Sequence, residues 1–185
     1  MQINKKIIFG ITIVFILALS RVLPHPPNFT PILGMAFFAG AVFDKKIYAY
    51  CIPILAMLIS DLYLGFHAGM PIIYFAICVC ILIGTFFHSK LNLTTSFLGI
   101  SAGVISFYLI SNFAVWYGSG MYASDLNGLI TCYIMALPFL QNTFLSSIFY
   151  GMAACILYLM ADKHLKFSAK PVSYTHLTLP TMLPV

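Results

Sequence analysis

The chain has 185 residues, of which 62% are hydrophobic and 7% are charged, and its formal net charge is +5. A soluble domain carries about 25% charged residues, so this composition excludes an ordinary water-exposed surface and predicts an integral membrane protein. The positive charge does not indicate a nucleic-acid-binding protein. The basic residues lie in short clusters between apolar runs and form no long basic stripe with interleaved aromatic residues.

The first half of the chain holds three apolar segments, each predicted to be a transmembrane helix. Residues 7–22 precede Pro24-His25-Pro26-Pro27-Asn28, where prolines stop the helix. A cleavable signal peptide ending near Ser20 is the alternative for this segment. Residues 32–43 cover only about 18 Å as a helix, so this span is expected to tilt little, to lie beside thinned lipid or to be partly re-entrant. Residues 47–64 form the third segment.

Three further segments complete a predicted six-helix, all-α membrane bundle. The fourth, residues 71–87, opens with Pro71, which suits the first turn of a helix. The fifth covers residues 97–117. Residues 126–137 are apolar but short and are interrupted by Pro138, so we expect a separate interfacial helix that leads into the sixth segment, residues 138–160.

Lysines mark one side of this bundle. With the N-terminus in the cytoplasm, the cytoplasmic segments hold eight basic residues and the outer segments hold only Arg21. The eight are Lys5, Lys6, Lys45, Lys46, Lys90, Lys163, Lys166 and Lys170. The asymmetry predicts an even number of spans with both termini inside, in a multi-pass membrane protein. The resemblance described below implies the bacterial cytoplasmic (inner) membrane as its location.

Residues 1–171 are predicted to form one integral membrane domain. The remaining stretch, residues 172–185, reads VSYTHLTLPTMLPV and has no helical period. It looks like translated sequencing-adapter read-through, so it is interpreted as a non-native tail, and the natural C-terminus is expected to have been lost near Lys170.

Polar side chains are predicted to share one depth in the bundle. At 1.5 Å per residue, Asp61, Asn112 and Asn142 each lie about 6 Å below the outer end of their segment. Arg21 lies about one turn from the outer end of the first segment. Polar groups inside a membrane are costly, so they usually mark a functional site or a structural clamp.

A polar layer beneath an aromatic, proline-rich rim fits a ligand pocket that opens to the outside. The candidate ligand-binding residues are Arg21, His25, Asn28, Asp61, His67, Asn112, Trp116, Tyr117 and Asn142. The alternative is that Arg21 and Asp61 form a structural ion pair while the two deep amides tie helices together. Trp116 and Tyr117 alone also fit an interfacial aromatic belt.

No catalysis, cofactor or metal is predicted. Asp61 is the only carboxylate well inside a span, and the sequence contains no Gly-x-Ser-x-Gly, His-Glu-x-x-His or P-loop pattern. The chain therefore is not interpreted as an enzyme and cannot hydrolyse ATP alone. The five cysteines lie within or beside apolar runs and show neither a disulfide framework nor zinc spacing. His25 and His67 lie in separate loops, which is a weak pattern for a metal site with Asp61.

Small residues four apart, Ala36 with Gly40 and Gly99 with Gly103, allow helices to approach closely. Two interpretations follow from this spacing. The residues pack helices within the chain, or they dock it onto another membrane subunit.

Four stretches resemble a known group of proteins. They are RVLPHPPNFTP at 21–31, MLISDLYLGFH at 57–67, NFAVW at 112–116 and LPFLQNT at 137–143. Together they resemble an uncharacterised family of small bacterial membrane proteins that is grouped with the substrate-binding (S) subunits of energy-coupling-factor (ECF) vitamin transporters. The resemblance covers about residues 7–160, and the first stretch is its most specific part.

The resemblance implies an ECF S-component-like bundle that captures a vitamin or similar micronutrient. Such a subunit docks on a membrane coupling subunit driven by cytoplasmic ATPases. The chain departs from the family pattern at Gln141, where an Arg often stands, and at Ser147, where an Asp often stands, so its ligand or affinity is expected to differ. Gln2 stands where metal-uptake relatives carry a His, which counts against nickel or cobalt as the cargo.

Substrate capture for such a transporter is thus the leading functional prediction. A proton-coupled secondary transporter that uses Asp61 is an alternative, although no inverted repeat is visible. A structural envelope protein whose polar layer is only a clamp is another. A membrane enzyme is the least supported class.

Overall fold

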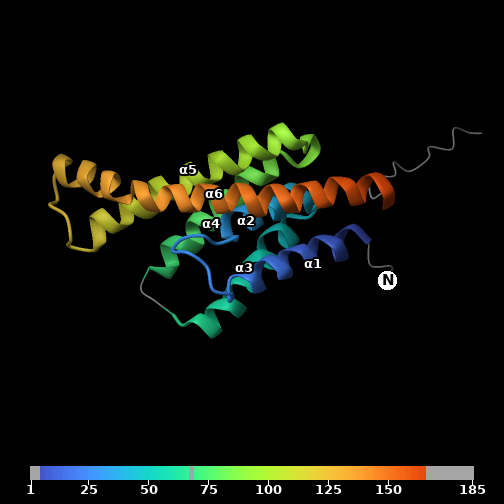
Figure 1. The fold of residues 1–185 in the computed structure, drawn as a ribbon, viewed down its shortest axis with the longest axis horizontal. Coiled ribbons are helices and arrows are strands. Elements are labelled where there is room, and N and C mark those ends of the chain that lie inside the picture. Colours follow the sequence, from blue (N-terminus) through green and yellow to red (C-terminus); the bar gives the residue numbers. More distant parts are fainter. Residues whose placement is uncertain (1–4, 67–68, 166–185) are drawn as a thin grey trace, which may run out of the picture.

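The computed structural model describes residues 5–66 and 69–165, and every regular element in them is helical (Figure 1). The elements are α1 (Lys5–Ser20), α2 (Ile32–Val42), α3 (Lys46–Leu64), α4 (Met70–Phe86), the 3₁₀ turn η1 (His88–Lys90), α5 (Leu93–Gly118) and α6 (Leu126–Leu165). The predicted all-α class is confirmed. Predicted helix boundaries for α1 to α4 agree with the observed ones to within two residues.

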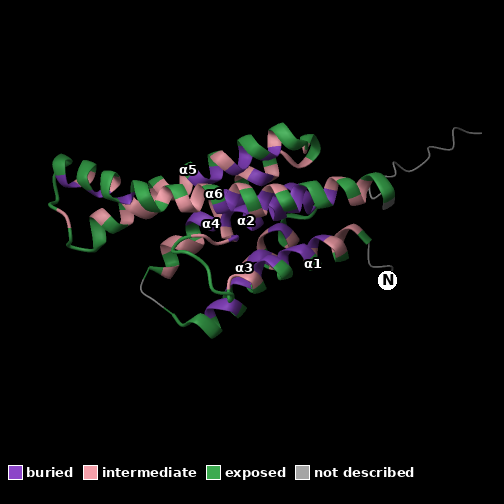
Figure 2. Ribbon diagram, in the orientation of Figure 1, coloured by how far each residue is buried: buried purple, intermediate pink, exposed green. Residues whose placement is uncertain are grey.

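The short helix α2 forms the centre of the bundle. Every residue from Leu33 to Val42 is buried, and α2 contacts each of the other five α-helices (Figures 1 and 2). A helix that is apolar on all faces belongs in a core. With 11 residues, α2 is about 16 Å long, roughly half the thickness of a bilayer core. Its shortness is accommodated because other helices, rather than lipid, surround it.

Glycines let α2 lie against its neighbours at backbone distance. A Cβ atom added to Gly40 would lie 2.1 Å from the carbonyl oxygen of Ile81, and one added to Gly84 would lie 2.3 Å from that of Phe37. On the other side of α2, a Cβ at Gly34 would lie 2.7 Å from the backbone nitrogen of Gly151. The paired glycines therefore set the spacing of α2 from α4 and from α6.

The small residues considered for partner docking all lie inside this packing. Ala36, Gly40, Gly99 and Gly103 are buried. Gly99 faces the Phe37 ring, where an added Cβ would come within 2.2 Å, and Gly103 faces the Cys80 side chain. The structure thus places all four in internal helix contacts and leaves none of them exposed to a partner.

The longer helices have the character of membrane spans. Three are long and apolar enough to cross a membrane, namely Lys46–Leu64, Leu93–Gly118 and Leu126–His164, while Ile32–Val42 and Met70–Phe86 are shorter apolar helices. Large apolar side chains such as Leu62 and Phe86 are 70% and 73% exposed on the outside of the bundle. Such a surface suits lipid and indicates a membrane protein. The six-span count and the orientation stay predictions.

The predicted boundaries of the last two helices differ more. α5 begins four residues before the predicted residue 97, and α6 ends five residues after the predicted residue 160. The predicted break at Pro138 is wrong. Residues 126–137 do not form a separate helix, because α6 runs unbroken for 40 residues with Pro138 inside it. The segment before Pro138 is held against α5 by two tyrosines: the Tyr108 hydroxyl donates to the Tyr133 carbonyl oxygen at 2.5 Å, and the Tyr133 hydroxyl donates to the Leu109 carbonyl oxygen at 2.7 Å. After Pro138, the Phe144 ring contacts the Phe97 ring of α5, with centroids 6.5 Å apart. Contacts with a neighbouring helix on both sides of a proline favour a continuous helix.

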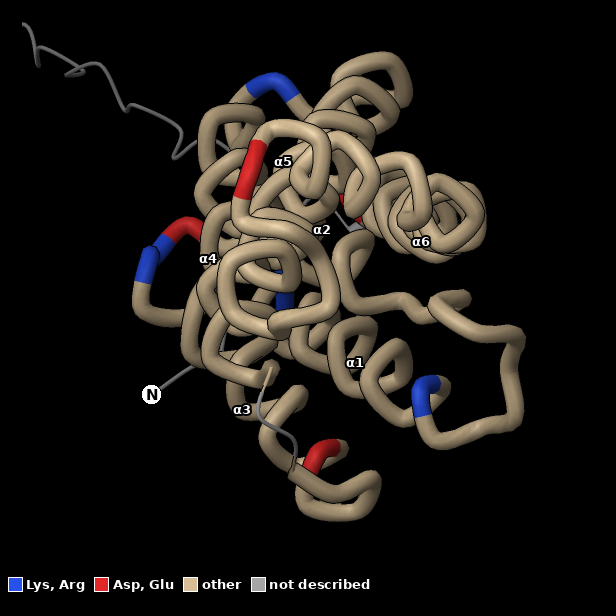
Figure 3. The backbone as a smooth tube through the Cα atoms, turned by 90° about the vertical axis from the view of Figure 1, so that its left-hand side faces the viewer, with Lys and Arg blue, Asp and Glu red and all other residues tan. Residues whose placement is uncertain are grey.

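The start of α1 and the end of α6 lie at the same end of the bundle (Figure 1). Charged residues are sparse along the rest of the backbone (Figure 3). At this end, Asp44 Oδ1 accepts from Lys6 Nζ at 2.6 Å and lies 2.9 Å from His88 Nε2, while His88 Nδ1 lies 3.0 Å from the Ala41 carbonyl oxygen. We call this group the Asp44 cluster. It ties α1, η1 and the α2–α3 connection together.

The charges around Asp44 shift its pKa. Partial burial acts to raise the pKa of the carboxyl, but the hydrogen bond and positive charge of Lys6, with the charge of His88, outweigh burial and hold the pKa below its ordinary value. A carboxyl with a depressed folded-state pKa stabilises the fold above its unfolded-state pKa, and this stability is lost as pH falls through the folded-state value.

Replacing Gly40 by Ala should destabilise the fold by about 2 kcal/mol, because the new methyl group overlaps the backbone of α4. Thermal unfolding of the purified protein in detergent measures the change. Gly118→Ala is the matched control, since a Cβ there meets nothing within 4 Å. Equal melting temperatures for the two variants would contradict the close approach of α2 and α4.

Asp44→Asn should lower the melting temperature at neutral pH by a small amount. Asp44 is 54% exposed at its side chain, so an effect of about 0.5 kcal/mol is expected for a surface ion pair. The difference from the unmodified protein should shrink as pH falls below about 4 and vanish once the pH lies below the depressed folded-state pKa, where the carboxyl is neutral in both states. A difference that persists in acid would show that the ionised carboxylate is not its source.

Candidate functional site

A buried ion pair joins three segments at the end of the bundle opposite the Asp44 cluster. Arg21, just after α1, donates from Nη1 to Asp61 Oδ1 and to Ser60 Oγ on α3, each at 2.6 Å. Tyr74 on α4 donates its hydroxyl to Asp61 Oδ2 at 2.6 Å. The side chains of Arg21 and Asp61 are 14% and 5% exposed. These four residues, Arg21, Ser60, Asp61 and Tyr74, form what we call the Arg21 clamp.

The clamp satisfies the polar groups of Asp61 and Ser60. Both carboxylate oxygens of Asp61 accept a hydrogen bond, and Ser60 accepts from Arg21 while donating to the Met57 carbonyl oxygen at 2.8 Å. A buried pair needs such extra hydrogen bonds, because the Coulomb attraction alone does not offset the loss of hydration.

A cavity of about 340 Å³ lies against the clamp, and we call it the clamp lobe. Its lining comes from the α1–α2 connection and from α2, α3, α4, α5 and α6. The lining residues are Arg21, His25, Asn28, Thr30, Ile32, Leu33, Met57, Asp61, Leu64, Met70, Ile73, Tyr74, Phe107 and Thr143. Because Ile32 and Leu33 begin α2, the N-terminal end of the central helix lies at this lobe.

A second cavity of about 270 Å³ adjoins the first, and we call it the amide lobe. The two lobes share Asn28, Ile73, Phe107 and Thr143. The other lining residues of the amide lobe are Gly69, Ile72, Tyr108, Ser111, Asn112, Val115, Ala136, Phe139 and Leu140. The two lobes have the size and the mixed apolar and polar lining of a small-molecule site.

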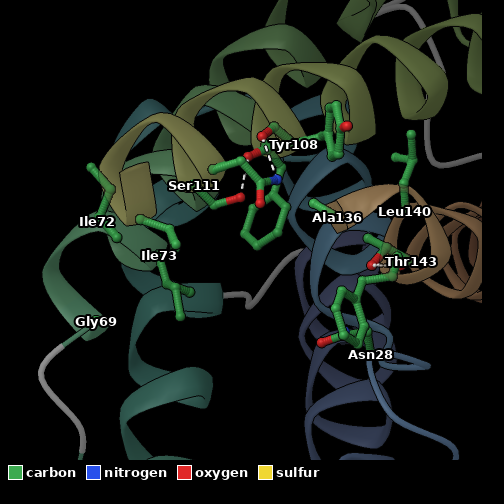
Figure 4. A pocket seen from close by; sticks show the side chains of 13 residues that line it. Asn28, Gly69, Ile72, Ile73, Tyr108, Ser111, Ala136, Leu140 and Thr143 are labelled. Atoms are coloured by element: carbon green, nitrogen blue, oxygen red, sulfur yellow. Dashed lines mark hydrogen bonds between the residues drawn. The ribbon is translucent and has the colours of Figure 1, made fainter. Parts of the chain in front are cut away.

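The polar groups of the amide lobe are held by backbone carbonyls. Figure 4 shows Tyr108 and Ser111 of α5 across the lobe from Thr143 of α6 and Asn28. Ser111 Oγ donates to the Phe107 carbonyl oxygen at 2.7 Å, and Thr143 Oγ1 donates to the Phe139 carbonyl oxygen at 2.9 Å. With their protons committed to the backbone, these hydroxyls offer lone pairs to the cavity.

Five of the predicted site residues line these lobes. Arg21, His25 and Asp61 line the clamp lobe, Asn112 lines the amide lobe and Asn28 lines both. Asn112 Nδ2 donates to the Tyr108 carbonyl oxygen at 2.8 Å, which fixes the amide on α5. The structural ion pair foreseen as the alternative for Arg21 and Asp61 is present, and the same two side chains also wall the cavity.

Three predicted site residues line neither lobe, and His67 lies outside the described residues. Asn142 Nδ2 donates to the Pro27 carbonyl oxygen at 3.0 Å and so ties α6 to the α1–α2 connection. Trp116 Nε1 donates to the Ala123 carbonyl oxygen at 2.9 Å, within the turn between α5 and α6, and Tyr117 is 81% exposed. Val115, the neighbour of Trp116, lines the amide lobe, so Trp116 lies at the depth of that lobe, but its ring bonds to the α5–α6 turn instead.

Sequence reasoning missed Ser60, Tyr74, Ser111 and Thr143. Tyr74 stands four residues after Met70, the first residue of α4, so it lies about 6 Å below that helix end, at the depth used to select Asp61. The same depth argument would have found it. Ser60 and Ser111 directly precede selected residues, but serine in a membrane helix often bonds to its own backbone, as Ser111 does here.

No metal site is visible in the part of the chain that the structure describes. No group of three or more His, Cys, Asp or Glu side chains in residues 5–66 and 69–165 is arranged to hold an ion. The side chains that line the two lobes offer hydrogen bonds and apolar contacts.

The chain belongs to a family of unknown function, DUF6580, which its sequence matches over residues 1–170. No curated protein and no solved structure shows significant similarity to it. Family membership supports the predicted relation to an uncharacterised family and assigns no activity.

Asp61→Asn should destabilise the protein by about 3 to 5 kcal/mol, because it leaves the Arg21 charge buried without a counter-charge. Adding Arg21→Gln should restore part of that loss, since the double variant buries no charge. The melting temperatures of both single variants, the double variant and the unmodified protein complete the cycle. Additive single effects would show that the two charges do not interact.

Proposed function

We propose that this family member is the substrate-capturing membrane subunit of an ECF-type uptake transporter, and that it binds a vitamin or similar micronutrient. The observation that carries the proposal is the pair of adjoining lobes at one end of the bundle, where the Arg21 clamp and Asn112 wall a cavity shared by five helices. Polar side chains that converge on an apolar cavity are typical of small-molecule sites.

The chemistry of the site favours binding over catalysis. The one deep carboxylate, that of Asp61, is occupied by Arg21 and Tyr74, and the hydroxyls of Ser111 and Thr143 donate to backbone carbonyls. None of these groups has the partner that a nucleophile or general base needs. A passive site for capture uses such groups to orient a ligand.

The lysine distribution and the resemblance to S subunits supply the direction of transport. The positive-inside rule places the Asp44 cluster in the cytoplasm and therefore opens the lobes to the outer side of the bacterial inner membrane. A subunit without ATP-binding residues requires a membrane coupling subunit and cytoplasmic ATPases to energise release. Purification of the tagged chain from native membranes should recover these partners, and their absence would count against the ECF assignment.

Two other functions predict different behaviour of the same site, and experiments on it distinguish them from substrate capture. A proton-coupled transporter that uses Asp61 would have to break the Arg21 clamp in every cycle, and its transport in proteoliposomes would proceed without ATPases and stop in Asp61→Asn. A purely structural protein is favoured by the way the clamp joins α1, α3 and α4. Such a protein would bind no small molecule.

Thr143→Trp should weaken ligand binding, because Thr143 lines both lobes and a large ring there occupies part of them. The loss is measured with a panel of water-soluble vitamins as the ligand-induced rise in melting temperature, which corresponds to about 2.7 kcal/mol at a hundred times the Kd. Affinity for the vitamin that binds should fall at least about tenfold, a change of about 1.4 kcal/mol.

Thr131→Trp is the matched control for this experiment. Thr131 also lies on α6 and donates to the carbonyl oxygen four residues earlier, that of Asn127, at 2.7 Å, but it is exposed and lines neither lobe. It should leave binding unchanged. Equal binding by both variants, or no binding by the unmodified protein, would overturn the proposed site.

A further inference from the structure

We infer that the ligand of the two lobes is an uncharged, planar molecule, with a hydrogen-bond acceptor that faces the Arg21 clamp and donors that face the amide lobe. The inference rests on the proposed function and names the chemical class that the site selects. It follows from the charges and the hydrogen-bond polarity of the described lining residues, and from the apolar surface that lies between the two lobes.

The charges on the cavity wall cancel. Among the lining residues, the groups that carry charge at neutral pH are Arg21 and Asp61, which are paired at 2.6 Å. His25 lies exposed at the rim, with Nδ1 2.9 Å from the Pro26 carbonyl oxygen. An ionised ligand would therefore bring a charge that has no counter-charge in an apolar cavity, which is costly.

A carboxylate ligand cannot simply replace Asp61 as the partner of Arg21. Asp61 is only 5% exposed at its side chain, and Tyr74 supplies just one donor to it. A ligand carboxylate that drew Arg21 toward itself would leave the Asp61 carboxylate buried, with its counter-charge shared between the two anions. The same reasoning opposes a cation, which would compete with Arg21 for Asp61 at close range. The pair thus discriminates against both signs of charge.

The hydrogen-bond groups of the amide lobe are mainly acceptors. Three hydroxyls that line it donate to backbone carbonyl oxygens: Tyr108 to Tyr133, Ser111 to Phe107 and Thr143 to Phe139. Each retains lone pairs that can accept a hydrogen bond from a ligand. A ligand with N–H or O–H groups on this side makes those bonds, whereas a ligand with only acceptors makes none with them.

The clamp lobe presents donors instead. The hydrogen bonds that Arg21 makes to described side chains all leave from Nη1. Its Nε and Nη2 groups therefore keep N–H donors for a neutral acceptor such as a carbonyl oxygen. Between the donors and the acceptors lie Phe107 and Ile73, which line both lobes and provide an apolar surface for a ring. An uncharged heterocyclic amide fits this sequence of contacts.

Matched ligands test the charge preference directly. Nicotinamide, nicotinate and N1-methylnicotinamide share one ring and are neutral, anionic and cationic; riboflavin and riboflavin 5′-phosphate form a larger neutral and anionic pair. Binding to the purified protein in detergent is measured by titration calorimetry and by the shift in melting temperature. The neutral member of a series should bind at least about tenfold more tightly than its ions. An ion that binds as tightly as its neutral analogue would overturn the inference.

Removing one charge should reverse the preference. Asp61→Asn leaves the Arg21 charge unpaired, so nicotinate should gain affinity relative to nicotinamide. Asp125→Asn is the control, because Asp125 caps the start of α6 by accepting from the Gly128 backbone and lines neither lobe. Where Asp61→Asn does not fold, the double variant with Arg21→Gln has an uncharged wall and should keep the preference for the neutral ligand. Preference for the anion in that double variant would contradict the role of the pair.

The molecule that copurifies with the chain from cells gives an independent readout. Its identification by mass spectrometry should yield a compound that is uncharged at neutral pH. An ionised compound would overturn this inference while leaving capture as the function. No copurified compound, together with no binding in either ligand series, would overturn the proposed function itself, so the two failures are distinguishable.

Discussion

A buried pair of opposite charges governs the cavity end of this protein. Arg21 and Asp61 lie in an interior with few other polar groups, and neither charge is stable there without the other. Their pairing fixes the chain after α1 against α3, and Tyr74 adds α4 to the same contact. The lateral positions of three segments thus depend on one carboxylate, which brings side chains distant in sequence to the wall of the clamp lobe.

The cavity itself follows from the short central helix. The helix α2 has 11 residues, whereas α5 and α6 have 26 and 40. The longer helices extend past the N-terminal end of α2 and leave space between them at that end. The α1–α2 connection partly covers that space. It is anchored by the hydrogen bond from Asn142 to Pro27 and by the contact of the Phe29 and Tyr150 rings, whose centroids lie 6.0 Å apart. Asn28 adopts a φ of 60°, a conformation that asparagine tolerates well, and faces both lobes.

Apolar periodicity and helix-stop residues were enough to predict the all-α fold and most helix ends, because these depend on local composition. Pro138 misled the prediction, since the packing of α5 on both sides of it is a tertiary effect that sequence does not display. Depth along each helix predicted one polar layer for Arg21, Asp61 and Asn112, and these side chains line the two adjoining lobes. Depth also placed Asn142 in that layer, but its side chain bonds to the α1–α2 connection, because depth does not tell which way a side chain points around the helix axis.

The atoms that stabilise the bundle at the clamp are also atoms that a ligand would contact, so stability and binding are coupled there. In the amide lobe, stability and binding depend on different atoms. Ser111 and Thr143 each bond to the backbone of their own helix and join no other element through that bond. A change at these residues alters the cavity without untying the helices. Evolution within such a fold therefore has room to change the ligand from α5 and α6 while Arg21, Asp61 and Tyr74 keep the shape of the site.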